Sequence, residues 1–127
     1  MFGRIEGVVV EGNRIGRRLG FPTANIRLSE RNEIKNGVYV VTINYKEFCY
    51  KGVANIGDKP TLNGDAERML EVNIFDFDKN MYGEHISVEL LYFIRNEVKF
   101  DSLEELRLQI DKDRMFAEEF FEKNNYL

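Results

Sequence analysis

The segment GVYVVTINYKEFCYKGVANIG, Gly37–Gly57, contains the clearest pattern of secondary structure in this chain. Its first part, Gly37–Asn44, is rich in Val, Ile, Tyr and Thr, the residue types enriched in β-strands. A second strand-like run, Glu47–Gly57, follows a short turn near Tyr45 and Lys46. Two strand-forming runs joined by so short a turn predict a β-hairpin.

Three more runs resemble these two. Arg4–Val10 is apolar and β-branched, while Met69–Phe77 and His85–Phe93 flank a turn, Asp78–Gly83, with the sequence DKNMYG. The sequence therefore predicts five or six antiparallel strands. Such a set must close or be covered to protect its edges, and a small Greek-key barrel is the natural solution.

The C-terminal segment, Asp101–Lys123, changes from the strand period to the helical one. Ser102 and Glu105 have the spacing of a capping box, which predicts a helix beginning at about Ser102. The apolar positions recur at close to helical spacing, at Leu103, Leu106, Ile110, Ala117 and Phe121. We expect this helix to pack on the barrel, with Phe120 and Phe121 buried against it.

Composition limits the classes of protein to consider. The 127 residues suit a single domain, 1–127, and 43% hydrophobic with 31% charged residues is typical of a soluble globular protein. The net charge of -4 argues against nucleic acid as the main partner. No segment resembles a signal peptide or a membrane span, so we expect a cytoplasmic protein without a membrane partner. The single cysteine, Cys49, excludes an intramolecular disulfide, and the single histidine, His85, argues against a zinc site.

The most unusual segment is GNRIGRRLGFPTAN, Gly12–Asn25, which directly follows the first predicted strand. Gly12, Gly16 and Gly20 recur at every fourth position, with arginines between them, but the last glycine is not followed directly by the lysine and Ser or Thr of a P-loop. It fits an irregular loop whose N–H groups and arginines could receive phosphate oxygens. An ordinary solvated surface loop remains the alternative.

The end of that segment, FPTAN, is the candidate metal site. Pro22 favours extended geometry before it, and in an extended segment Thr23 and Asn25 point to the same face. A hydroxyl and an amide oxygen are hard ligands of the kind that suits Mg²⁺. Alternatively, both side chains cap backbone groups in a turn.

Glu71 is the candidate catalytic carboxylate. In Met69–Phe77, Leu70, Val72 and Ile74 form one apolar face, and Glu71 lies in the middle of the other. A buried charge is costly unless it is paired, so a carboxylate at such a position is a candidate general base. The alternative is that this second face is simply exposed to solvent.

These segments together resemble the riboflavin kinase domain, in particular the kinase half of the bacterial bifunctional riboflavin kinase/FAD synthetase. The similarity runs in order through nearly the whole chain, in the segments GVVVEGNRIGRRLGFPTANI, NGVYVVTI, GVANIGDKPT, LEVNIFDF, MYGEHISVELLYFIRNEVKFDSLEEL and QIDKD. The most specific part is the PTAN element preceded by Gly-Arg-x-Leu-Gly. The family pattern is matched at Gly12, Gly16, Arg17, Leu19, Gly20, Pro22, Thr23, Ala24 and Asn25, then at Gly57, Pro60, Thr61, Glu71, Tyr82, Gly83, Arg95 and Phe100.

The resemblance implies a mainly β fold, a closed six-stranded antiparallel Greek-key barrel with a C-terminal α-helix. It implies transfer of the ATP γ-phosphoryl group to the ribityl 5′-hydroxyl of riboflavin, giving FMN and ADP, with Mg²⁺. Thr23 and Asn25 would ligate or orient the metal, Glu71 would be the base, and Arg95 to Phe100 would belong to a flap over the flavin. The loop residues over the ATP phosphates would be Gly12, Gly16, Arg17, Leu19, Gly20 and Pro22.

The bifunctional proteins of this family also carry an N-terminal FMN adenylyltransferase domain with a His-x-Gly-His signature. With one histidine, this chain is not expected to adenylylate FMN, so it is either monofunctional or a domain of a longer parent chain. Two other classes stay open from the residues alone: a barrel that binds flavin or nucleotide without reaction, and a barrel used as an interaction domain.

Overall fold

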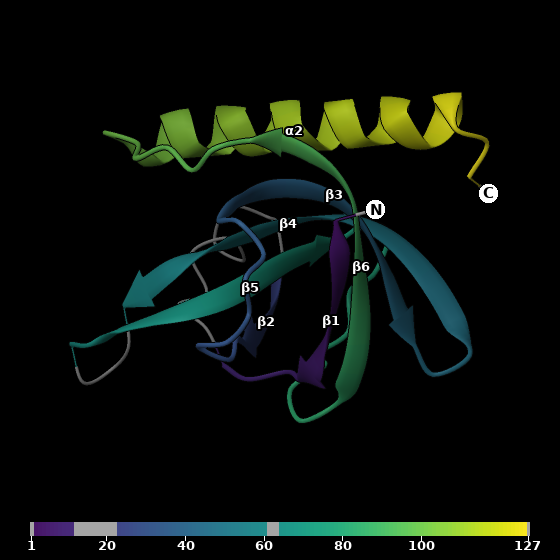
Figure 1. The fold of residues 1–127 in the computed structure, drawn as a ribbon. Coiled ribbons are helices and arrows are strands. Elements are labelled where there is room, and N and C mark those ends of the chain that lie inside the picture. The colour runs from purple at the N-terminus through teal and green to yellow at the C-terminus, as the bar shows by residue number, and fades with distance from the viewer. Residues whose placement is uncertain (1, 12–22, 61–63, 127) are drawn as a thin grey trace.

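The computed structural model describes residues 2–11, 23–60 and 64–126, which form one sheet and one helix (Figure 1). The elements in chain order are β1 (Gly3–Val8), β2 (Thr23–Arg27), β3 (Gly37–Tyr45), β4 (Phe48–Pro60), β5 (Ala66–Ile74), β6 (His85–Arg95) and α2 (Leu103–Lys123). The strand order is β1-β6-β3-β4-β5-β2, and every pairing is antiparallel. No helix in the described ranges has the length and apolar character needed to cross a membrane.

The centre of the sheet is a Greek key. Strands β3, β4 and β5 follow one another as neighbours, and β6 returns to lie beside β3, which is the 4-1-2-3 order of that motif. The predicted hairpin is confirmed: Tyr45 pairs with Phe48 across the two-residue turn of Lys46 and Glu47. Lys46 has a φ of 55°, because so tight a turn requires left-handed backbone at its tip.

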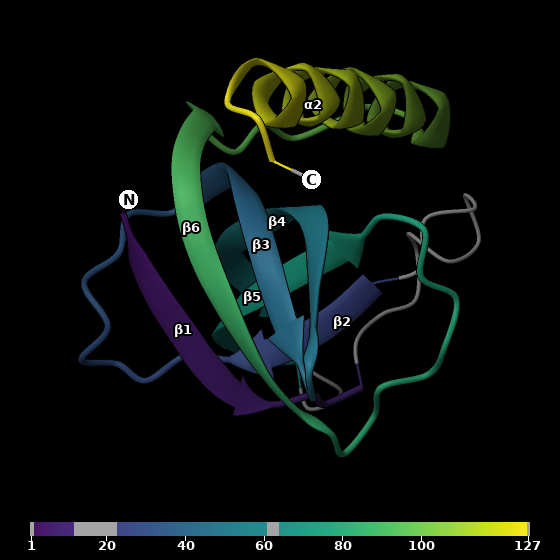
Figure 2. The same cartoon turned by 90° about the vertical axis from the view of Figure 1, so that its right-hand side faces the viewer.

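The sheet curls into an open half-barrel rather than a closed barrel, so the expectation of closure is wrong (Figure 2). The six antiparallel strands and the C-terminal helix are confirmed. Among the described residues, the two edge strands, β1 and β2, are joined by one isolated bridge, in which the Val10 N–H donates to the Asn25 carbonyl at 2.8 Å. The edges do not pair along their length because β1 ends at Val8, and the bridge to β2 is made by Val10, two residues further on.

Apolar side chains fill both faces of the central strands. On β3, Tyr39, Val41 and Ile43 point into the main core, whereas Val40 points outward to the helix. There it packs with Phe75, Ala117 and Phe121, so α2 covers part of the outer face of the sheet (Figure 1). Phe121 is 2% exposed, as predicted, and Phe120 packs against the same cluster while only partly buried.

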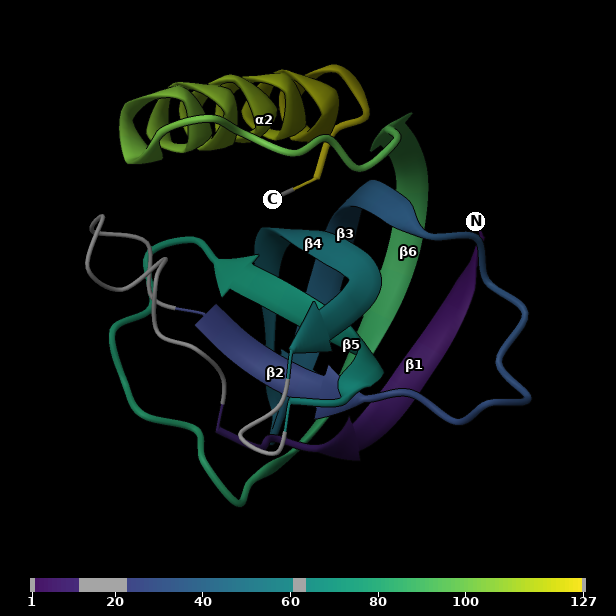
Figure 3. The ribbon, with the colours of Figure 1, turned by 90° about the vertical axis from the view of Figure 1, so that its left-hand side faces the viewer.

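The helix begins where the sequence predicts. The Ser102 hydroxyl accepts from the Glu105 N–H at 3.1 Å, and the Glu105 carboxylate accepts from the Asp101 N–H at 3.1 Å. Before the helix, residues 96–102 run alongside α2 in the opposite direction (Figure 3). This segment therefore lies beside the helix.

Candidate functional site

The register of β2 against β5 brings the predicted metal and base residues together. Thr23 pairs with Asn73, and Asn25 pairs with Glu71. Directly opposed residues of antiparallel strands point to the same face, with Cβ atoms about 5 Å apart. The three side chains predicted to carry the chemistry therefore share one face, while Ala24, Ile26, Leu70 and Val72 point to the core.

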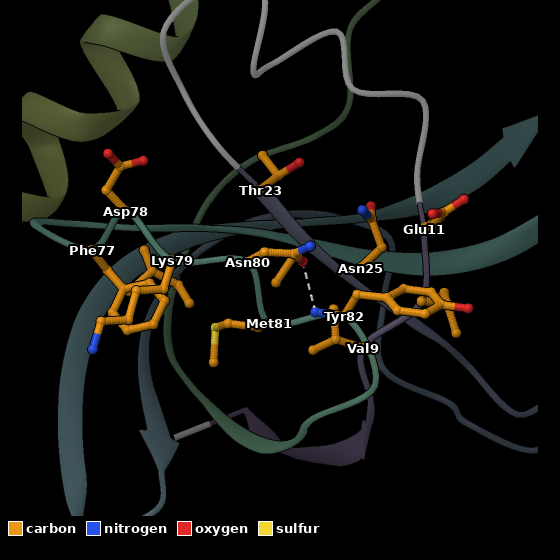
Figure 4. Close-up of a pocket in the computed structure, with 13 residues that line it drawn as sticks. Val9, Glu11, Thr23, Asn25, Phe77, Asp78, Lys79, Asn80, Met81 and Tyr82 are labelled. Carbon is orange, nitrogen blue, oxygen red and sulfur yellow. Dashed lines mark hydrogen bonds between the residues drawn. The ribbon is translucent and has the colours of Figure 1, made fainter.

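Thr23 and Asn25 line a cavity that we call the Thr–Asn cavity. Its other walls are residues 9–11 and 77–82, together with Ala24 and Ile74. In Figure 4 the polar ends of Thr23, Asn25 and Glu11 lie on the same side of the strands. Within the described part of the chain, the side chains of Thr23 and Asn25 make no hydrogen bond, although Asn25 is only 6% exposed. Both polar groups are therefore available to a ligand.

A second cavity, which we call the glutamate cavity, has a volume of about 230 Å³ and contains Glu71. It lies between the outer face of the sheet, residues 95–100 and α2. Its lining residues are Thr23, Val38, Val53, Asn55, Lys59, Glu71, Asn73, Phe75, Arg95, Glu97, Val98, Phe100, Leu106, Ile110, Asp113 and Arg114. Thr23 lines both cavities, so the two spaces meet at this side chain.

The face that carries Glu71 is partly covered by residues 95–100 and α2, with Glu71 half-buried, so the alternative of a simply solvent-exposed face is wrong. Burial raises the pKa of the Glu71 carboxyl; the Lys59 ammonium opposes this shift and the Glu97 carboxylate adds to it. Lys59 lies on β4, where its Nζ donates to Asn55 Oδ1 at 2.6 Å and lies 3.5 Å from Glu97 Oε2. Lys59 and Glu97 are thus the charged side chains that act on the Glu71 carboxyl in this cavity.

The raised pKa predicts how stability changes with pH. Since the folded protein holds the Glu71 proton more tightly than the unfolded chain, the free energy of unfolding falls as the pH rises from about 4.5 through the raised pKa. The variant Glu71→Gln lacks this ionisation. We expect it to be more stable than the wild type at pH 8, with the difference shrinking toward pH 4, in urea unfolding followed by circular dichroism. A variant that is less stable at pH 8 by the same amount as at pH 4 would contradict this assignment.

Arg95 was predicted to belong to the flavin flap, and the structure gives it a firm structural partner. Its Nε and Nη2 donate to the two carboxylate oxygens of Asp113 on α2, at 2.9 and 2.8 Å. Gln109 also donates to Asp113, which is 5% exposed. The Arg95 guanidinium lies 6.0 Å from the ring centroid of Phe100. Arg95 therefore fixes the start of the predicted flap to the helix, and Phe100 lines the glutamate cavity.

The predicted phosphate loop lies outside the described residues. This applies to Gly12, Gly16, Arg17, Leu19, Gly20 and Pro22, and also to Thr61 of the family pattern. Tyr82 of that pattern lines the Thr–Asn cavity and is 60% exposed. His85 is exposed at the start of β6, as predicted for a surface residue.

Several cavity residues were not identified as site residues from the sequence. Asn55, Lys59, Asn73 and Asp113 all line the glutamate cavity. A local signal existed for Asn73 because it follows Glu71 by two positions and therefore shares its face. For Lys59 and Asp113 no local signal exists, since their place in the cavity depends on contacts between distant segments. Glu97 lines the cavity within the predicted flap, Arg95 to Phe100.

Comparisons with known proteins identify the family of this chain. The sequence profile of the riboflavin kinase family, Flavokinase, matches residues 3–121. The chain is 48% identical over 119 residues to the bifunctional riboflavin kinase/FMN adenylyltransferase of Haemophilus influenzae, covering 93% of this chain and 38% of that protein. It is 47% identical over 109 residues to the RNA-binding riboflavin kinase RibR of Bacillus subtilis, covering 86% of this chain and 47% of that one.

A solved structure supports the same assignment. The crystal structure of riboflavin kinase from Trypanosoma brucei superimposes with a TM-score of 0.68 at 26% identity, covering 97% of this chain and 82% of that one. The chain spans less than half the length of the two curated relatives, at 38% and 47%. Because the family profile covers almost every residue of the sheet and helix, this chain belongs to the riboflavin kinase family.

Proposed function

We propose that this chain transfers the γ-phosphoryl group of ATP to the 5′-hydroxyl of the ribityl chain of riboflavin, giving FMN and ADP. The observation that carries this proposal is the position of Thr23, which lines both the Thr–Asn cavity and the glutamate cavity. We assign the nucleotide phosphates to the first cavity and riboflavin to the second. The reacting oxygen and phosphorus would then meet beside Thr23, within reach of Glu71.

Glu71 is the proposed general base. As the ribityl oxygen forms its bond to the γ-phosphorus, its proton passes to a Glu71 carboxylate oxygen. The bond from the γ-phosphorus to the bridging oxygen breaks at the same time, and that oxygen leaves with ADP. A base works best when its pKa lies near the working pH, and burial shifts the Glu71 pKa in that direction.

Riboflavin kinases use ATP and a divalent metal ion, and we propose Mg²⁺. The residues present fit such an ion: Thr23 and Asn25 offer oxygen atoms on one face and have no hydrogen-bond partner within the described ranges. Oxygen ligands are the kind that Mg²⁺ prefers, and it commonly shares its shell with water and phosphates. Bound there, the ion would neutralise phosphate charge during transfer.

The loop before β2 and the segment after β6 would help to bind the two substrates. The loop residues Gly12, Gly16, Arg17, Leu19, Gly20 and Pro22, which lie outside the described residues, would bind the ATP phosphates through N–H groups and positive charge. Phe100 would contact the flavin, since it lines the glutamate cavity. Arg95 would act indirectly by anchoring the flap to Asp113.

The proposal concerns the kinase step alone. The Haemophilus influenzae relative is named for two activities, and this chain matches 38% of it. The single histidine of this sequence leaves no His-x-Gly-His motif, the signature that the family resemblance connects with the adenylyltransferase domain.

The direct test is to incubate the protein with riboflavin, ATP and Mg²⁺ and to separate the flavins by chromatography. FMN formed in proportion to protein and time supports the kinase. Quenching of riboflavin fluorescence without FMN would replace the kinase with a flavin-binding module. If neither FMN nor quenching is observed, an interaction domain is the better description.

The metal assignment predicts the behaviour of Thr23→Val, which replaces the hydroxyl with a methyl group of similar size. We expect the Mg²⁺ concentration for half-maximal activity to rise at least about tenfold, as for other losses in a metal's ligand environment. Thr23→Ser keeps the hydroxyl and is the matched control, which should stay close to the wild type. An unchanged metal dependence in Thr23→Val would make this threonine a structural residue only.

A further inference from the structure

The segment after β6 contacts β4 through Glu97, in addition to the contact of Arg95 with Asp113 on α2. The Glu97 carboxylate lies directly over Gly57, where a Cβ atom would overlap both of its oxygens. Its Oε2 also lies 3.5 Å from Lys59 Nζ. A glycine at position 57 therefore provides the room for this carboxylate, and Lys59 provides the opposite charge.

This contact closes one wall of the glutamate cavity. Glu97, Val98 and Phe100 line the cavity from one side, and Glu71 lines it from the sheet. The side chains of Lys59 and Glu97 are 22% and 34% exposed, so the ion pair is only partly open to water. The Lys59 ammonium also donates to Asn55 Oδ1 at 2.6 Å, which keeps Lys59 on the sheet. If the ion pair breaks, we therefore expect Glu97 to move and Lys59 to stay.

The cavity is small for its proposed ligand. Sites for small molecules commonly occupy roughly 300–1,000 Å³, whereas this cavity has about 230 Å³ and is partly open to solvent. An outward movement of residues 96–100 would enlarge it toward the size that a three-ring flavin needs. The strands are fixed by their hydrogen-bonded ladders, and α2 is held through Asp113 to Arg95 at the end of β6, so the wall that Glu97 holds is the one we expect to move.

We propose that Glu97 and Lys59 form a latch that holds residues 96–100 over the glutamate cavity and limits the rate at which a ligand enters and leaves it. The identity of the ligand as riboflavin rests on the proposed function, whereas the latch itself does not. Both residues are positioning residues: they act through the cavity wall. When Glu97 moves away, Lys59 stays on β4 and continues to balance the charge of Glu71.

The latch can be tested without any ligand by measuring access to the cavity. Asn73, which lines the cavity from β5, is changed to cysteine in a Cys49→Ser background, and its labelling by a small thiol reagent is followed in time. Glu97→Gln and Lys59→Met should each increase the labelling rate about two- to fivefold, the size expected for a partly exposed ion pair. The double variant should label no faster than the faster single variant. Glu119→Gln and Lys112→Met, at exposed positions of α2, are the matched controls.

Riboflavin kinetics give the second measurement. Stopped-flow quenching of riboflavin fluorescence should show association and dissociation both faster in the two latch variants, by the same two- to fivefold, with little change in the midpoint of urea unfolding. Unchanged labelling rates in Glu97→Gln and Lys59→Met would overturn the latch. It would also be overturned if the two rate increases multiplied in the double variant, because residues that act independently behave that way. If the wild type binds no riboflavin, the proposed function fails, while the labelling rates still decide the latch.

Discussion

Replacing Glu71 with Gln is expected to lower turnover of riboflavin to FMN by about 10²–10⁴-fold, the range that a positioned general base contributes. Gln is nearly the same size and can keep polar contacts in the cavity, but it cannot accept the hydroxyl proton. Because Glu71 lines the glutamate cavity and not the Thr–Asn cavity, ATP binding should change little. Initial rates at saturating substrates, with ATP affinity measured by calorimetry, check both parts.

Glu67→Gln is the control for this experiment. Glu67 lies on the same strand, β5, but pairs with Arg27 at the surface and does not line the cavity. Its rate should stay within about twofold of the wild type, as for other surface ion pairs. Turnover of Glu71→Gln within threefold of the wild type would remove Glu71 from the mechanism and favour a role in packing.

The largest expected loss of stability is for Asp113→Ala, at about 3 kcal/mol or more, because it leaves the Arg95 guanidinium without its carboxylate in a poorly hydrated place. Two hydrogen bonds from Arg95 and one from Gln109 end at this carboxylate, which is 5% exposed. Asp113→Asn keeps one acceptor for Arg95 and should lose less. Urea unfolding monitored by circular dichroism gives both values.

Asp111→Ala controls for the change in helix propensity, since it lies two residues earlier on α2 and lines neither cavity. It should change the free energy of unfolding by less than about 1 kcal/mol. Equal losses of unfolding free energy in Asp111→Ala and Asp113→Ala would show that the contact of Arg95 with Asp113 adds no stability beyond the change in helix propensity.

The sequence was informative wherever the structure depends on local patterns. The strands near Gly37–Asn44 and His85–Phe93 were predicted because β-branched and aromatic residues fit a pleated surface. The start of α2 followed from Ser102 and Glu105, whose capping contacts involve neighbours only. The common face of Thr23 and Asn25 followed from the period of extended backbone, and the structure shows both in one cavity.

Contacts between segments that are distant in the sequence could not be predicted from local patterns. FPTAN was expected to be extended, but its pairing with β5, and so the position of Glu71 opposite Asn25, depends on the register between distant segments. Whether the Glu71 face was buried depended on α2 and residues 96–100, which cover it. The closed barrel was expected from a family likeness, whereas within residues 2–11, 23–60 and 64–126 a single bridge joins the two edges of the sheet. The partner of Arg95 is eighteen positions away and gives no periodic signal.

Among the described residues, Thr23 alone lines both the Thr–Asn cavity and the glutamate cavity, and this has a consequence for inhibitor chemistry. An inhibitor that occupies both cavities at once would have to pass its linker beside this small side chain. A larger residue at position 23 should therefore prevent binding of the linked inhibitor, while each half of the inhibitor alone still binds in its own cavity.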